Sequence, residues 1–195
     1  MFHQLDIDRT LGLLDCAPIV PRRPTAWRHF ATRPYENVRL SEIAAEAEVT
    51  PQTLHTNFGS KEQLFTAVAL RWGRQEMARR DEAPVGEVCE AIEILFDRYE
   101  ANGNTVLRML SEEERIPAVR RITDAGRAYH RDWAARTFQP LLHGLRGRSR
   151  ERRLAAIVIA TDLLVWKLLR RDMQLDRRTA EQIVAEMVNS LPPAR

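Results

Sequence analysis

Residues 40–65 constrain the fold of this chain most, because two short helices and the start of a third can be read from LSEIAAEAEVTPQTLHTNFGSKEQLF. In the run 40–49, apolar residues recur at helical spacing and leave Glu and Ser on the other side. These apolar residues are Leu40, Ile43, Ala44 and Ala47. The pattern predicts a short amphipathic helix.

The second helix of this region is predicted to begin at Thr50 and Pro51. The Thr hydroxyl can cap free backbone N–H groups, and proline at the first helical position loses no hydrogen bond. Leu54 and Phe58 lie four residues apart and should face inward. The outward side then carries polar residues: Gln52, Thr53, His55, Thr56 and Asn57.

The end of this helix and the start of the next are also visible in the sequence. Gly59 can adopt the left-handed conformation that ends a helix, and Ser60 with Gln63 forms a capping box. Two helices joined by a tight turn, with a polar exposed side on the second, are typical of the helix-turn-helix motif. The second helix of that motif enters the major groove of DNA.

Residues 30–68, FATRPYENVRLSEIAAEAEVTPQTLHTNFGSKEQLFTAV, resemble the DNA-binding domain of the TetR family of bacterial transcriptional regulators. The matching positions are Phe30-Ala31, Tyr35, Ile43-Ala44, Val49-Thr50, Thr53-Leu54, Phe58, Ser60-Lys61-Glu62 and Leu64. The resemblance implies an all-α protein, in which a three-helix DNA-binding domain precedes a larger helical domain for ligand binding and dimerisation. We place the first domain at 25–80, including a linking fourth helix, and the second at 81–195.

Ten residues are candidates for contact with an operator in double-stranded DNA. Amides can pair with adenine, Thr methyl groups can touch thymine, and the Lys61 ammonium at a helix start favours a phosphate. Arg39 cannot cap its helix but could reach a phosphate, and Ser41 is expected to cap instead. The ten are Arg39, Ser41, Thr50, Pro51, Gln52, Thr53, His55, Thr56, Asn57 and Lys61.

The chain departs from the family pattern in three places. Glu48 stands where the turn usually has Gly, and a positive φ there would cost about 1–2 kcal/mol. His55 replaces a frequent Tyr. Upstream, prolines at 18, 21 and 24 exclude a long first helix, which should begin no earlier than Thr25. Its packing face should be Trp27, Phe30 and Ala31, and residues 1–24 are left without an assigned fold.

The rest of the sequence has no strand-like alternation, so the class is all-α. Helices are expected at 60–80, 85–101, 104–112, 117–142, 151–171 and 177–191. The basic run 146–153 should be a solvated loop, and the acidic residues between Asp81 and Ile116 should repel DNA.

Several classes of protein are excluded by what the sequence lacks. The first residues have no basic start and no long apolar run, which predicts a cytoplasmic protein without a secretory signal. The apolar segment 154–169 is too short to span a membrane and contains Asp162 and Lys167. Cys16 and Cys89 fit neither a zinc site nor a disulfide framework, and no cofactor or metal is expected. No catalytic constellation is visible, so an enzyme is not expected.

The segment 154–169 is apolar nearly all the way round, so it must be covered on both sides. With the last helix it could form the four-helix interface of a two-fold dimer. The expected interface residues are Ile157, Val158, Val165, Ile183, Val184, Met187, Val188 and Leu191. A helix at the centre of a monomeric bundle is the alternative.

The resemblance further implies a pocket for a small apolar effector. The aromatic and polarizable residues that could line it are Trp72, Phe96, Tyr99, Met109, Trp133, Phe138, Asp162 and Trp166, although each could equally be core. Asp162 could hold a polar group of the ligand or bond internally. We therefore interpret the chain as a homodimeric transcriptional repressor that binds a palindromic operator and responds to a ligand. The alternatives are an activator of the same plan, or a ligand-binding dimer with impaired DNA binding.

Overall fold

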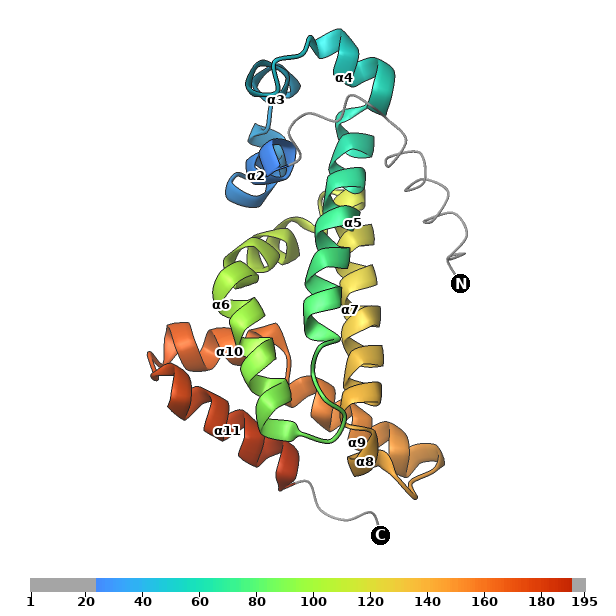
Figure 1. Ribbon diagram of the computed structural model, residues 1–195, viewed down its shortest axis with the longest axis vertical. Coiled ribbons are helices and arrows are strands. Elements are labelled where there is room, and N and C mark those ends of the chain that lie inside the picture. The colour runs from blue at the N-terminus through green and yellow to red at the C-terminus, as the bar shows by residue number, and fades with distance from the viewer. Residues whose placement is uncertain (1–23, 191–195) are drawn as a thin grey trace. The chain divides into compact units, whose positions relative to one another are not determined.

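The computed structural model describes residues 24–190, which form helices joined by turns and contain no strand (Figure 1). The all-α class is therefore confirmed. The expectations for residues 1–23, including Cys16, and for Leu191 lie outside the described residues. The first described helix begins at Pro24, one residue before the expected limit at Thr25.

The elements follow one another from α2 to α11 with short connections. In chain order they are α2 Pro24–Thr32, the 3-10 turn η1 Tyr35–Asn37, α3 Leu40–Glu46, α4 Pro51–Phe58, α5 Lys61–Arg80, α6 Val88–Glu112, α7 Pro117–Thr137, α8 Gln139–Leu142, α9 Gly147–Ala160, α10 Leu163–Lys167, the π-helical turn η2 Leu168–Asp172 and α11 Arg177–Asn189.

The described chain divides into two compact units. The N-terminal unit contains 24–74 and 108–122, and the C-terminal unit contains 75–107 and 123–190. This division differs from the boundary expected after residue 80, because the end of α6 and the start of α7 pack into the N-terminal core. Residues of that core are Phe30, Val38, Ile43, Leu54, Leu64, Phe65, Met109, Ile116 and Val119.

Helix α6 runs unbroken through Asn102-Gly103-Asn104, where the sequence had suggested a break between two helices. A Cβ placed on Gly103 would lie 2.6 Å from the Cζ3 atom of Trp166. The glycine is therefore required for close packing of α6 against α10, and the expected turn at this position is wrong.

The expected single helix over 151–171 is also wrong. Helix α9 begins at Gly147, so most of the basic run 146–153 is helical, and the helix ends before Thr161. There the carboxylate of Asp162 caps α10 by accepting a hydrogen bond from the backbone N–H of Leu164 at 2.8 Å. An N-cap of this kind starts a new helix, which explains the break.

The core of the C-terminal unit is built from aromatic and branched side chains. Its buried residues include Leu95, Trp133, Phe138, Leu142, Leu154, Ile157 and Val188. Buried Phe138 separates α7 from the short α8, where one helix over 117–142 had been expected. Within residues 24–190, no helix combines the length and the apolar character needed to cross a membrane.

Candidate nucleic-acid interface

The turn between α3 and α4 is closed by backbone hydrogen bonds. The N–H of Val49 donates to the carbonyl of Ala44 at 3.0 Å, and that of Glu48 donates to Ala45 at 3.2 Å. These two bonds form a Schellman motif, whose central residue must have a left-handed backbone. Glu48 has φ of 57°, so the strain expected at this position is present.

Both ends of α4 have the local chemistry predicted from the sequence. The Thr50 hydroxyl accepts from the backbone N–H of Thr53 at 3.1 Å, and Pro51 occupies the first turn. At the other end Gly59 has φ of 70°, and the Ser60 hydroxyl accepts from the N–H of Gln63 at 3.1 Å. Thr50 therefore caps the start of α4, Gly59 ends this helix, and Ser60 caps the start of α5.

The inward and outward sides of α4 are clearly separated. Leu54 is only 2% exposed, and α3 packs against both α2 and α4, which fixes the orientation of the helix. Gln52, His55 and Thr56 are exposed, and their side chains form no hydrogen bond with any residue of 24–190. Exposed donors and acceptors on one side of a rigid helix are what base recognition requires.

Two other polar residues of α4 are partly engaged within the helix. The hydroxyls of Thr53 and Thr50 lie 2.9 Å apart, and the amide nitrogen of Asn57 donates to the carbonyl of Thr53 at 2.7 Å. Asn57 keeps its amide oxygen as an acceptor. Exposed Pro51 offers only apolar contact. These residues are therefore poorer candidates for base contacts than Gln52.

Lys61 lies at the first position of α5 and is held by the turn η1. Its Nζ donates to the carbonyl oxygen of Glu36 at 3.2 Å and lies 4.6 Å from the centroid of the Tyr35 ring. Partial burial lowers the pKa of Lys61, and the charge of Glu36 opposes this shift. An ammonium has three donors, so two remain for a phosphate.

The start of α3 differs in one respect from expectation. Arg39 occupies the cap position and makes no side-chain cap bond, as the sequence predicted. Ser41 does not cap the helix, because α3 begins at Leu40 and places Ser41 inside its first turn. Both side chains are exposed in the N-terminal unit, which contains all ten candidate DNA-contact residues.

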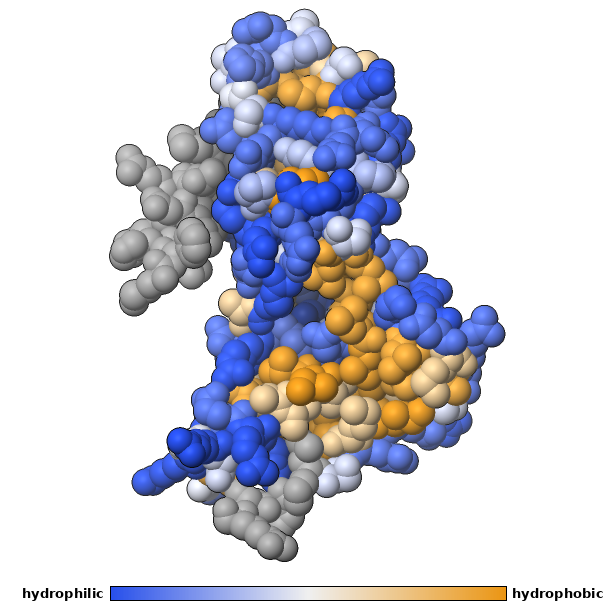
Figure 2. Space-filling model, turned by 180° about the vertical axis from the view of Figure 1, so that it is seen from behind, coloured by the Kyte–Doolittle hydropathy of each residue, from blue (hydrophilic) through white to orange (hydrophobic). Residues whose placement is uncertain are grey.

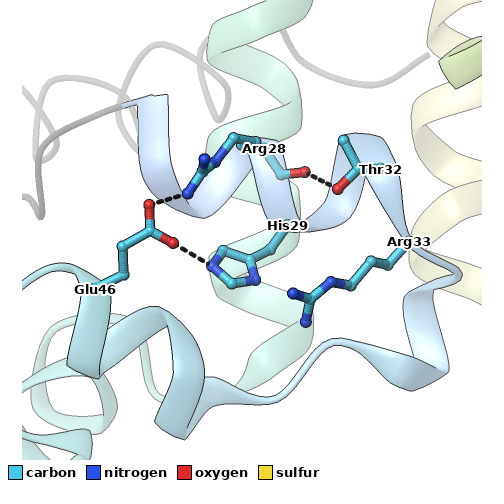
Figure 3. A pocket seen from close by; sticks show the side chains of 5 residues that line it. All are labelled: Arg28, His29, Thr32, Arg33 and Glu46. Atoms are coloured by element: carbon cyan, nitrogen blue, oxygen red, sulfur yellow. Dashed lines mark hydrogen bonds and ion pairs between the residues drawn. The ribbon is translucent and has the colours of Figure 1, made fainter.

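A pocket of about 270 Å³ between α2 and α3 was not anticipated from the sequence (Figure 3). His29, only 7% exposed, places its Nε2 2.8 Å from Glu46 Oε2, and Arg28 forms an ion pair with the same carboxylate. The hydrogen bond from His29 is the main cause that lowers the pKa of Glu46. Arg33 pairs with Glu42, which lies one turn before Glu46 in α3.

These contacts identify the pocket as a polar clamp between two helices. Its arginines already have carboxylate partners, so the pocket is not an open anion site. Together with buried Ala26 and Phe30, the clamp holds the short α2 against the helix-turn-helix motif. No sequence pattern pointed to it, because His29 and Glu46 are separated by 17 positions along the chain.

The eight residues expected to line an effector pocket are divided between the two units. Trp72 stacks on Trp27 in the N-terminal unit, with ring centroids 4.5 Å apart, and Met109 belongs to the core of that unit. The other six lie in the C-terminal unit: Phe96, Tyr99, Trp133, Phe138, Asp162 and Trp166. Asp162 serves as a helix cap there.

The polar atoms of these aromatic residues are already engaged. Trp133 Nε1 donates to the carbonyl of Arg80 at 3.0 Å, and Trp166 Nε1 donates to Glu100 at 3.1 Å. The hydroxyl of Tyr99 donates to the carbonyl of Thr161 at 2.9 Å. The pocket of the clamp and a groove along α11 are lined by none of the eight.

Apolar side chains gather on one face of the C-terminal unit (Figure 2). Large exposed residues on α9, α10 and the segment after them are Ile159, Leu164, Leu168 and Met173. Of the expected interface residues, Met187 is 38% exposed, and Val158, Val165 and Ile183 are half-buried. The remaining described ones, Ile157, Val184 and Val188, are at most 1% exposed, so they are core residues and the expectation for them is corrected.

The geometry of α3, the turn and α4 defines a helix-turn-helix DNA-binding unit. Residues 25–68 match the family model of the bacterial regulatory proteins of the tetR family. Residues 25–68 therefore form a DNA-binding domain of the kind found in TetR-family transcriptional regulators. No curated protein matches the chain closely enough to count as a relative.

Proposed function

We propose that the chain represses transcription by placing α4 in the major groove of a palindromic operator. The observation that supports this function is the exposed polar side of α4, on which Gln52, His55 and Thr56 have no hydrogen-bond partner within 24–190. In helix-turn-helix proteins the N-terminal residues of the recognition helix contact base edges. Gln52, in the first turn of α4, is our strongest candidate for pairing with an adenine.

The start of α5 would supply the phosphate contact that fixes the register on the duplex. Lys61 is already positioned by Tyr35 and Glu36, and the first backbone N–H groups of a helix favour an anion. Exposed Arg39 at the start of α3 would add a second phosphate contact. Phosphate contacts of this kind give affinity and orientation, whereas base contacts give specificity.

A homodimer is the second part of the proposal. Ile159, Leu164 and Leu168 are 49–63% exposed in the single chain. Packing against a second copy would remove these apolar side chains from water. A two-fold dimer would present two copies of α4 about 34–36 Å apart, the spacing of successive major grooves. The operator would then be an inverted repeat.

The response to a small apolar effector and the cytoplasmic location stay predictions. The residues expected around the effector are packed and hydrogen-bonded, so entry of a ligand would require them to move. The alternative hypothesis is that the chain activates transcription and does not repress it. A dimer with impaired DNA binding is a further alternative, because Glu48 adds strain and a negative charge next to α4.

Selection of bound duplexes from a random pool by the full chain tests the proposal. We expect an inverted repeat whose half-site centres lie one helical turn or a small multiple of it apart. Recovery of single, unpaired half-sites would contradict the dimer. Recovery of no preferred sequence would contradict specific DNA binding and favour the impaired alternative.

A further inference from the structure

The C-terminal unit holds a half-buried guanidinium that has no acidic partner. Arg80, the last residue of α5, lies over two aromatic rings: its guanidinium carbon is 4.5 Å from the centroid of Trp133 and 5.3 Å from that of Tyr129. Its Nη2 donates to Nδ1 of His130 at 2.6 Å. These rings and the imidazole attract the cation, but none of them carries a compensating negative charge.

No carboxylate of residues 24–190 forms an ion pair with Arg80. The neighbouring Asp81 pairs with Arg136 at 3.0 Å and accepts from the hydroxyl of Tyr129 at 2.9 Å. In addition, Nε of Arg80 is buried and has no hydrogen-bond partner within the described part of the chain. Buried donors without a partner are uncommon, and a partly buried charge normally has an opposite charge beside it.

His130 occupies the position in which a carboxylate would be expected. A guanidinium can only donate, so Nδ1 of His130 must accept, and the proton of the ring must be on Nε2. That nitrogen lies 3.2 Å from the hydroxyl of Thr161 and 3.4 Å from the carbonyl of Val158. Burial, and then the charge of Arg80, lower the pKa of His130 to about 3, so the ring is neutral.

We propose that Arg80 binds the carboxylate of a small acid with an apolar body, and that His130 takes the place of this carboxylate when no ligand is bound. The inference rests on the effector response of the proposed regulator and names the chemical class of the effector. A carboxylate accepts two parallel hydrogen bonds from a guanidinium, and such charge-assisted bonds are roughly twice as strong as neutral ones. A carboxylate therefore competes well with the neutral imidazole of His130 for the guanidinium of Arg80.

The surroundings of Arg80 favour a carboxylic acid over a phosphate. Trp133 and Tyr129 flank the guanidinium, and the ring of His130 stacks on Trp133 at 5.7 Å between centroids. A doubly charged phosphate would lose more hydration among these rings than a singly charged carboxylate. Because Nη2 of Arg80 already donates to His130 and the guanidinium lies over Trp133, binding of a carboxylate would displace the imidazole and change the contacts of Trp133.

Matched acids and amides test the proposal on the full chain. Benzoate and octanoate would be titrated against benzamide and octanamide, with binding measured by calorimetry and by tryptophan emission. We expect each acid to bind at least about tenfold more tightly than its amide. The Arg80→Met variant should lose this difference, and Arg136→Met, which removes an exposed arginine already paired with Asp81, should keep it.

Three results would overturn the inference: equal affinity for acids and amides, no binding of either acid, or an unchanged preference in Arg80→Met. If Arg80→Met does not fold, His130→Leu replaces it, since removal of the competing acceptor should tighten acid binding, and weaker acid binding would count against the proposal. Binding of a selected DNA duplex is measured on the same protein without acid. A chain that binds DNA but ignores both acids loses this inference alone, whereas one that binds acids but no DNA loses the proposed function.

Discussion

The ammonium nitrogen of Lys61 lies 4.6 Å from the centroid of the Tyr35 ring and donates to the carbonyl of Glu36. The ring of Tyr35 is itself held against Phe65, with centroids 5.3 Å apart, and its backbone N–H donates to Glu112. Lys61 is thus positioned before DNA arrives. A side chain that is already ordered loses less entropy when it binds, which favours phosphate contact.

Lys61→Ala should weaken binding to every duplex by a similar factor. Because one phosphate contact is lost, the slope of log affinity against log salt concentration should fall by about one unit. The measurement is fluorescence anisotropy over a range of salt concentrations. Lys167→Ala is the control, because Lys167 pairs with Asp172 in the C-terminal unit, and it should leave the slope unchanged. A loss confined to one DNA sequence would exclude the phosphate role.

Glu48→Gly should stabilise the N-terminal unit. A residue with a Cβ at φ of 57° costs about 1–2 kcal/mol, and the greater freedom of Gly in the unfolded chain offsets about 0.5–1 kcal/mol of the gain. The expected rise in the free energy of unfolding is roughly 0.5–1 kcal/mol, measured by urea denaturation. Glu48→Ala keeps the Cβ and should give no such rise. Equal effects of both substitutions would show that charge, not backbone strain, matters here.

His130 should make the protein sensitive to acid. Its pKa is about 3 in the folded state, so below about pH 6.5 the unfolded chain binds a proton that the folded chain does not. Neutral His130 therefore costs no stability above that pH. Below it, the free energy of unfolding should fall by about 1.4 kcal/mol for each pH unit, which amounts to roughly 2 kcal/mol at pH 5. His130→Asn should flatten this dependence between pH 6.5 and 5 in urea denaturation. Substitution of exposed His143 by Asn should not, and identical slopes in all three proteins would refute the assignment.

Substitutions at exposed and at buried apolar positions distinguish an effect on dimerisation from an effect on folding. Leu164 is 56% exposed in the single chain, so Leu164→Glu should yield a folded monomer in sedimentation velocity experiments. Val188 is fully buried, and Val188→Glu should prevent folding, because an unpaired buried charge is costly. A monomeric state of the unmutated chain at micromolar concentration would remove the dimer and the palindromic operator together.

The parts of the fold that depend on neighbouring residues could be predicted from the sequence. Thr50-Pro51 and Gly59-Ser60 act through local capping chemistry, and the structure confirms both ends of α4 and the cap at the start of α5. The helix break predicted at Gly103 is wrong because the role of this glycine depends on Trp166, which is far away in the sequence. The end of α9 was missed because Asp162 was interpreted by its apolar neighbours and not as an N-cap.

The same limit applies to the candidate sites. The polar side of α4 follows from helical periodicity, so its residues could be named in advance. The pairs His29–Glu46 and Arg80–His130 join positions 17 and 50 residues apart, and no local pattern announces them. Periodicity also could not separate the buried Val188 from the exposed Leu164, because both lie in helices rich in apolar residues.

The central claim, that α4 reads DNA sequence, is tested most directly through Gln52. The measurement is the affinity of the chain and of Gln52→Ala for the selected operator and for duplexes changed one base pair at a time. We expect the substitution to cost about 1–3 kcal/mol on the operator and to abolish discrimination at one or two positions of each half-site. An equal loss on every duplex, or an unmutated chain that does not distinguish them, would contradict the claim.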